Sequence, residues 1–252
     1  MPQIGIFDND QMGLGASPVL SGLTLLKTAR NLKVNSFFDD FLGAFPATGV
    51  PTGNWIQWSN GAGAAVIEHP GTTLRPGIVE FSTGTTNTGH ASLISQYIFA
   101  NGAYAFGGGE FTVEGDVYIH DLSTALEEYA ITLGWSDQIV PATDGCYFLY
   151  DRTQSVNWLT VTAVGGARTF TDTGIPVVAG AWIRFRIEIN ADGSAVTFYL
   201  GDVLVATNGV NIPTGDAALS GLNLNILKSV GITARKFDVD WIWLHYNLTT
   251  SR

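Results

Sequence analysis

Four polar side chains alternate along the segment EFTVEGDVYIHD, residues 110 to 121, and all four are types that can take part in proton transfer. Side chains of a strand point alternately to its two faces, which places Glu114, Asp116, Tyr118 and His120 on one face. Two carboxylates can act as nucleophile and general acid on a glycosidic bond, and an imidazole can donate a proton in a lyase. The same row could also form a binding surface or the solvated face of a sheet.

The other face of this segment is apolar, since it carries Phe111, Val113, Gly115, Val117 and Ile119. This alternation predicts a strand with one buried face.

Arg184 and Arg186 alternate with apolar residues in a later segment, AWIRFRIEIN. If the two strands are neighbours, Glu114 or Asp116 would pair with one of these arginines, and each such pair contributes about 0.2 to 1 kcal/mol. We consider this structural interpretation simpler than a catalytic one.

Short alternating segments separated by turn residues continue from Phe37 onward, without long amphipathic helices between them. The segments around ADGS at 191 to 194 and Gly201-Asp202 predict a three-stranded antiparallel meander. The last segment, FDVDWIWLHYNL, is apolar on both faces, which predicts a central or covered strand. A chain of 252 residues with 46% hydrophobic residues suits one all-β domain.

The order and spacing of four segments resemble the concanavalin A-like lectin and glucanase superfamily, above all its laminin-G-like jelly rolls. These segments are EFTVEGDVYI, YAITLGWSD, GAWIRFRIEINADGSAVTFYLGDVLVAT and FDVDWIWLHY. FFDDFLG at 37 to 43 is similar to the first strand of such domains. The resemblance implies an antiparallel two-sheet jelly-roll sandwich over residues 37 to 252, with residues 1 to 36 as an N-terminal arm. The fold hosts lectins, hydrolases, lyases and structural modules, so it does not decide the activity.

The resemblance also implies where glucanase carboxylates would stand, in an E-x-D-x-E pattern on one strand. Glu114 and Asp116 match the first two places, but Tyr118 occupies the third. A tyrosine, with an ordinary pKa of about 10, is a poor substitute for the required acid. We therefore expect no enzyme, and keep a polysaccharide hydrolase, or a lyase with His120 as proton donor, as an alternative.

A sugar or metal site is the next question for the same row. Glu114, Asp116 and Asp121 resemble the first metal ligands of legume-type lectins, but the remaining ligands of those lectins have no counterpart in this sequence. We expect no cofactor, with calcium on backbone carbonyls as an option. Trp158 in DRTQSVNWLTV is the first candidate for an exposed sugar-stacking ring, with an ordinary core position as the alternative. The candidate carbohydrate site consists of Trp158, Tyr118, Glu114, Asp116 and His120.

Charge and cysteine content exclude several classes of function. The net charge is −10 and the basic residues are scattered, so nucleic acid is not an expected partner. The single cysteine, Cys146, lies beside aromatic residues and is expected to be a small core residue. We also expect no membrane span and no secretory signal.

Residues 1 to 36 lack strand alternation, and Val19, Leu23 and Leu26 recur at helical spacing. A short helix or a docked arm fits this segment. By analogy with jelly-roll modules, we expect a non-enzymatic bacteriophage virion protein, made in the host cytoplasm, as a capsid decoration or a tail- or fibre-associated component. Its partners would be capsid or tail proteins and sister subunits of a homo-oligomer, with host glycans as a further ligand; a free carbohydrate-binding lectin is the main rival.

Overall fold

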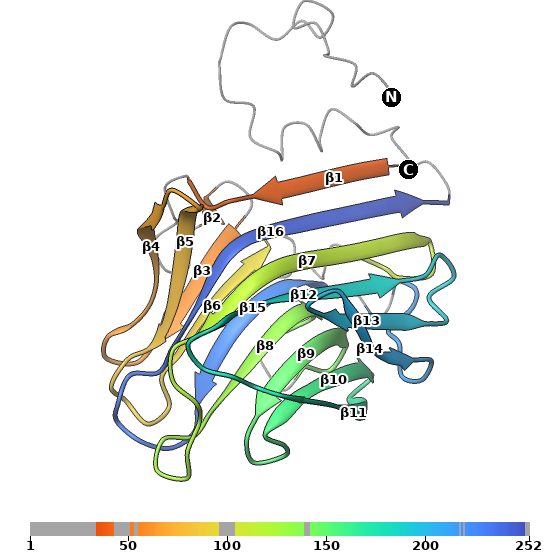
Figure 1. Cartoon of the computed structure of the whole chain (residues 1–252). Coiled ribbons are helices and arrows are strands. Elements are labelled where there is room, and N and C mark those ends of the chain that lie inside the picture. The colour runs from red at the N-terminus through yellow and green to blue at the C-terminus, as the bar shows by residue number, and fades with distance from the viewer. Residues whose placement is uncertain are drawn as a thin grey trace, which may run out of the picture.

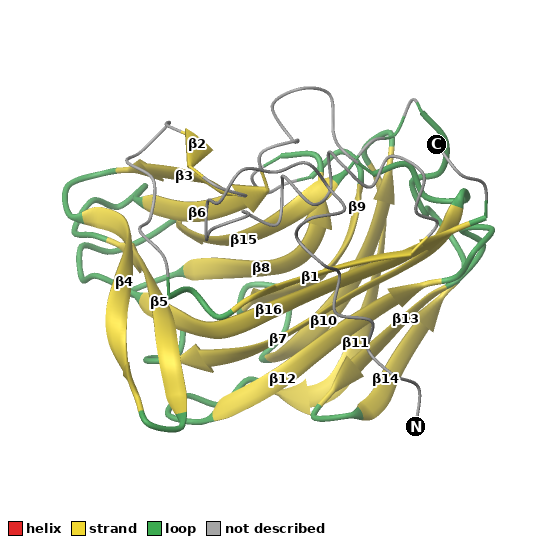
Figure 2. Cartoon of the chain, turned by 90° about the horizontal axis from the view of Figure 1, so that it is seen from above, coloured by secondary structure: helices red, strands yellow, loops and turns green. Residues whose placement is uncertain are grey.

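The computed structural model of the chain describes residues 34–42, 51–52, 55–95, 104–138, 142–216, 218 and 220–249. Within these ranges the chain consists of strands joined by loops, as Figure 2 shows. The described residues contain no helix long and apolar enough to cross a membrane. The helix expected near Val19 to Leu26, and the arm up to residue 33, lie outside the described residues. Residues 34 to 36, expected in the arm, belong instead to the first strand.

Sixteen strands form two antiparallel sheets among the described residues. Sheet A has the order β14-β13-β12-β7-β16-β5-β4, with β1 pairing along β16 (Figure 1). Its strands are β1 (Val34–Asp39), β4 (Ala64–Thr72), β5 (Arg75–Thr83), β7 (Gly109–Ile119), β12 (Trp182–Ile189), β13 (Val196–Leu200), β14 (Val203–Asn208) and β16 (Lys236–Leu248).

Sheet B has the order β11-β10-β9-β8-β15-β6-β3-β2. Its strands are β2 (Pro51–Thr52), β3 (Trp55–Asn60), β6 (His90–Ser95), β8 (Tyr129–Ser136), β9 (Gly145–Asp151), β10 (Asn157–Val164), β11 (Ala167–Pro176) and β15 (Gly221–Lys228). The expected all-β sandwich of two antiparallel sheets is therefore confirmed.

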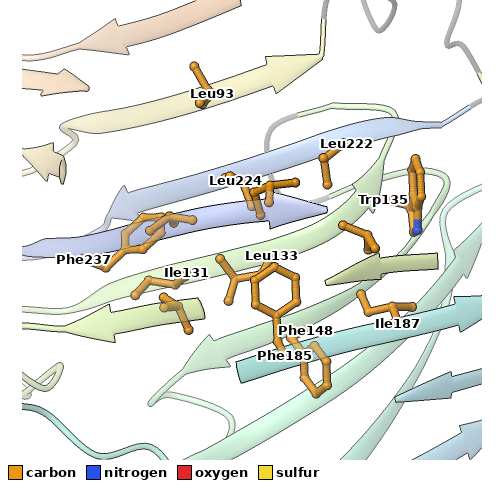
Figure 3. Packing of buried hydrophobic residues seen from close by; sticks show 14 of the residues in the cluster. Leu93, Ile131, Leu133, Trp135, Phe148, Phe185, Ile187, Leu222, Leu224 and Phe237 are labelled. Atoms are coloured by element: carbon orange, nitrogen blue, oxygen red, sulfur yellow. The ribbon is translucent and has the colours of Figure 1, made fainter. Parts of the chain in front are cut away.

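The core fills the space between the two sheets. Figure 3 shows Phe185 and Phe237 of sheet A among Leu133, Phe148 and Leu224 of sheet B. Complete burial of a side chain of this size contributes about 1.5 to 3 kcal/mol, so this aromatic and aliphatic layer is the main source of stability. It fixes which face of each strand points outward.

The sequence patterns of sheet A are reproduced in the structure. The odd-numbered positions of β7, from Phe111 to Ile119, are buried. Strands β12, β13 and β14 form the predicted meander, and Gly201 and Asp202 both have positive φ, 55° and 65°, as a two-residue hairpin turn requires. Strand β16 is central, as expected, because β5 and β1 pair with its two halves on one edge and β7 pairs on the other.

The prediction that Trp158 is an exposed sugar-stacking ring is wrong. Its side chain is only 1% exposed, and its ring packs near Phe148 and Tyr150 in the core. Strand β10 turns this residue toward sheet A, so the polar segment that precedes it does not make it a surface residue. Cys146, in contrast, is fully buried as expected, and burial raises the pKa of its thiol.

Candidate functional site

The polar row of β7 lies on the outer face of sheet A, because the alternate residues of β7 face the core. Across from this row, β12 places Arg186 opposite Glu114, Arg184 opposite Asp116 and Trp182 opposite Tyr118. His120 follows directly after the end of β7. The structure thus brings together four of the five predicted site residues and leaves out Trp158, which is buried in the core.

Asp116 is the centre of an ion-pair network on this face. Its carboxylate lies 3.2 Å from Nη1 of Arg75 and accepts a hydrogen bond of 3.1 Å from Nε of Arg184. Arg75 also pairs with Asp240, and Arg184 lies 3.5 Å from Glu114. The cross-strand pairing expected from the sequence is confirmed.

A bulge in β16 completes this network. The register shifts between Val239 and Ile242, so that Asp240 and Trp241 together stand opposite one residue of β7. A bulge of this kind redirects side chains, and here both reach the outer face: Asp240 binds Arg75, and Trp241 packs beneath Arg184.

Each arginine of this face also stacks on an aromatic ring. The guanidinium carbons of Arg75 and Arg186 lie 4.0 Å from the ring centre of Trp182 and 4.1 Å from that of Tyr199. The guanidinium of Arg184 lies 5.3 Å from the ring centre of Trp241. We call this surface the Arg–aromatic face, and its members are Phe38, Arg75, Trp182, Arg184, Arg186, Tyr199 and Trp241.

The electrostatics of Glu114 bear on the glucanase alternative. Burial raises the pKa of this carboxyl, and Arg184 and Arg186 act against that rise. A retaining pair of carboxyl groups needs about 5 to 5.5 Å between them, with the glycosidic bond in the gap. Arg184 contacts both Glu114 and Asp116, so a guanidinium bridges the two carboxylates.

A second cluster lies at the end of β7. His120 Nε2 is 2.9 Å from Asp238 Oδ1, and that carboxylate raises the pKa of the imidazole against the opposing effect of burial. Lys236 Nζ lies 2.8 Å from Glu80 Oε1, and His69 Nε2 lies 3.7 Å from Glu80 Oε2.

Sequence reasoning identified His120 in this cluster and missed its partners. The alternation of Asp238 and Asp240 in FDVDW was an available signal. The sequence around Glu80, IVEFS, contains no such signal, because the residues that Glu80 contacts lie on other strands and are set by the strand order.

The metal ligands suggested by the resemblance to legume-type lectins do not come together. Glu114 and Asp116 are occupied by arginines, and Asp121 lies 3.7 Å from Arg235. The group that could hold an ion within the described ranges is instead Glu80, His120 and Asp238, whose ligand atoms all lie within 4.8 Å of one another.

The outer face of sheet B carries a different set of polar side chains. Asn225 pairs in register with Thr132 on one side and Ser92 on the other, and all three are fully buried. Both amide atoms of Asn225, the hydroxyl of Thr132 and Oδ1 of Asn223 have no hydrogen-bond partner among the described residues. A buried amide without hydrogen-bond partners is costly, and Asn225 is the clearest case on this sheet.

A hollow of about 440 Å³ lies at one end of the sandwich and contains none of the predicted site residues. Phe106, Gly107, Asp192, Thr214 and Asp216 are among the residues that line it.

Comparison with protein families gives one family model that covers most of the chain. The model "SO2946-like, C-terminal domain" matches residues 74–240. No curated protein matches the sequence.

Solved structures with the same fold include enzymes. The protein of unknown function SO2946 from Shewanella oneidensis MR-1 has a TM-score of 0.63 at 12% identity, over 94% of this chain and 98% of that one. An endo-1,3-beta-glucanase from Streptomyces sioyaensis has a TM-score of 0.53 at 14% identity, over 85% and 96%. A Bacteroides ovatus mixed-linkage-glucan GH16 protein has a TM-score of 0.55 at 10% identity, over 82% and 99%. These similarities confirm that the chain has the jelly-roll fold seen in the glucanases. At such low identity they show the fold alone.

Proposed function

We propose that this chain, which belongs to the SO2946-like C-terminal domain family, is a non-enzymatic structural and binding module that associates with sister subunits through the Arg–aromatic face. The family name states no activity. The observation that carries the proposal is that arginines neutralise the acidic row of β7 and stack on tryptophan and tyrosine rings.

The composition of this face is that of protein interfaces. Arginine, tryptophan and tyrosine are enriched at the centres of such interfaces and carry most of their binding energy. Sugar rings, by contrast, need an open aromatic face. Here Arg75 lies over Trp182, while Arg184 and Phe38 both pack on Trp241, so the described contacts already occupy these rings.

Self-association fits the charges of the face. Asp116 and Asp240 are matched by Arg75 and Arg184 within one subunit, so a second copy would meet a surface of mixed charge. Phe38, at 58% exposure, is an apolar anchor beside Trp241 that such contact would bury.

A Phe38→Asp variant tests this interface by sedimentation velocity over a range of concentrations. We expect the wild-type chain to associate and the variant to sediment as a monomer. Leu126→Asp is the matched control, because Leu126 is 82% exposed in the loop between β7 and β8 and is not a member of the Arg–aromatic face, and it should associate like the wild type. A wild-type chain that stays monomeric, or a Phe38→Asp variant that associates normally, would contradict the proposal.

The setting we propose for such an assembly is a bacteriophage virion, in a capsid, tail or fibre, with the chain made in the host cytoplasm. The acidic charge and the arm expected before β1 support this setting by analogy. Because β1 begins at Val34, deletion of residues 1 to 33 removes none of the described strands of sheet A. We expect this deletion to abolish incorporation into particles, measured by immunoblotting purified particles; normal incorporation would argue against a docking arm.

Carbohydrate binding is the second candidate. It requires a sugar to uncover the outer face of sheet B, where the buried amide of Asn225 has no hydrogen-bond partner among the described residues. Amide and hydroxyl groups such as those of Asn225 and Thr132 can hydrogen-bond to sugar hydroxyls. A glycan array followed by calorimetry should then show a ligand that the Asn225→Leu variant loses and that a Glu188→Gln variant on sheet A keeps. Equal binding by both variants would place any sugar elsewhere.

The endo-1,3-beta-glucanase and an alginate lyase, AlyC3, which is also similar in fold, suggest an enzymatic alternative. Incubation with β-1,3-glucan, mixed-linkage glucan or alginate would release reducing ends or unsaturated product if it holds. Loss of that product in Glu114→Gln or His120→Ala would support catalysis and refute the non-enzymatic proposal.

A further inference from the structure

Three strands of sheet A bring one ligand atom each to the end of β7. Glu80 comes from β5, Asp238 from β16, and His120 from the residue after β7. Asp238 stands directly opposite Glu80 on one side and Tyr118 on the other, so the register of the sheet determines this meeting. The ligand atoms of the three residues lie within 4.8 Å of one another.

The contact between His120 and Asp238 has an unusual geometry. Nε2 and Oδ1 are 2.9 Å apart, yet neither atom has a hydrogen-bond partner of acceptable direction among the described residues, and both are shielded from solvent. The two atoms are close enough to each other, and to a carboxylate oxygen of Glu80, to bind one cation together.

The charged groups around this point are those that a metal ion would pair with or displace. Glu80 and Asp238 are both acids, and Lys236 is the cation that contacts Glu80. The remaining oxygen of Glu80 faces His69 Nε2 at 3.7 Å, and His69 is half exposed on β4, where its side chain can move. A second imidazole is therefore within reach of the same carboxylate.

We propose that Glu80, His120 and Asp238 bind a divalent transition-metal ion, with His69 as a fourth ligand. Two imidazoles and two carboxylates are a donor set that suits Zn²⁺ in tetrahedral coordination. Ca²⁺ is a poorer match, because it takes six to eight oxygen ligands. The site is independent of the proposed interface.

Glu80, His120 and Asp238 need only small movements to bind one ion, whereas His69 has to swing in from β4. With bonds of about 2.0 to 2.1 Å, neighbouring ligands of a tetrahedral Zn²⁺ lie about 3.3 Å apart. His120 Nε2 and Asp238 Oδ1 would separate slightly from 2.9 Å. Lys236 would have to leave Glu80, so this lysine competes with the metal.

The experiment uses the full chain, freed of metal with EDTA and dialysed, and titrated with ZnCl₂ by calorimetry and with CoCl₂ by visible absorption. We expect one equivalent of Zn²⁺ and a Co²⁺ spectrum typical of tetrahedral coordination. His120→Gln and Asp238→Asn should each weaken Zn²⁺ binding more than about 10-fold. Mutating residues that only hydrogen-bond to metal ligands already lowers metal affinity by about 10-fold or more, and loss of a ligand should cost at least as much. His245→Gln is the matched control, since His245 lies on the same sheet and binds Ser36 instead.

A Lys236→Met variant separates metal binding from a merely structural cluster. Removing the competing ammonium should tighten Zn²⁺ binding, whereas loss of a structural ion pair would not. Circular dichroism checks that each variant is folded. The proposal is overturned if the wild-type chain binds no Zn²⁺, if His120→Gln and His245→Gln bind alike, or if Lys236→Met weakens binding.

Discussion

Replacement of Asp116 by asparagine tests whether the polar row of β7 stabilises the fold. This substitution keeps the size of the side chain but removes the charge that Arg75 and Arg184 share. The Asp116 side chain is 10% exposed, while those of the arginines are 26% and 41% exposed. Exposed ion pairs contribute about 0 to 1 kcal/mol, and breaking a buried pair costs about 3 to 5 kcal/mol.

The network lies between these limits, and both arginines keep a second carboxylate. We therefore expect Asp116→Asn to lower the free energy of unfolding by about 2 kcal/mol, or about 1 for each pair. With a urea dependence of about 3 kcal/mol per molar, the unfolding midpoint would fall by about 0.7 M.

Urea unfolding followed by tryptophan fluorescence is a suitable assay. Glu188→Gln is the matched control, because Glu188 forms a single pair with Arg186, with side chains 37% and 28% exposed, and its midpoint should change little. If Asp116→Asn is no less stable than Glu188→Gln, the row is not a structural network. An unchanged stability together with a lost binding or catalytic activity would return the row to a functional role.

Three further predictions concern buried positions. Gly115→Ala should cost about 1 to 3 kcal/mol, because its Cβ would lie 2.7 Å from the carbonyl oxygen of Trp241, while Gly108→Ala, which has open space, should change the urea midpoint little. Trp158→Ala should cost about 3 to 5 kcal/mol in the same assay; an unchanged midpoint would restore its surface role. The buried Cys146 thiol, whose pKa is raised by burial, should resist a thiol reagent in the native protein and react in urea; rapid native labelling would contradict its burial.

The sequence is sufficient to predict the strands of sheet A but not the partners of their polar faces. Period-two alternation identifies β7 and β12, and opposite charges at Asp116 and Arg184 predict the pair between them. Arg75 and Asp240 could not be foreseen, because they are 165 residues apart and meet only through the strand order and the bulge of β16. The prediction that Trp158 is exposed is wrong because it is based on the polar residues before Trp158. The alternation of side chains along β10 decides the direction of the ring, and it turns the ring into the core.

The metal-binding candidate shows a similar limit. His120 is recognisable as a titratable residue, but its geometry depends on Glu80 and Asp238, which lie on two other strands. Local spacing, on which motif searches rely, carries no signal for a site whose ligands are brought together by sheet register.

The pairing of β1 with β16 has a consequence for the order of assembly. Ser36 meets His245 across 209 positions of sequence, so this edge of sheet A cannot close until nearly the whole described chain has left the ribosome. Such distant pairings form late and slow the folding of β proteins. Until β16 has been made, β1 lacks its partner, and its backbone can pair with a strand of another molecule. The same edge that completes the monomer is therefore a point where newly made copies can exchange strands.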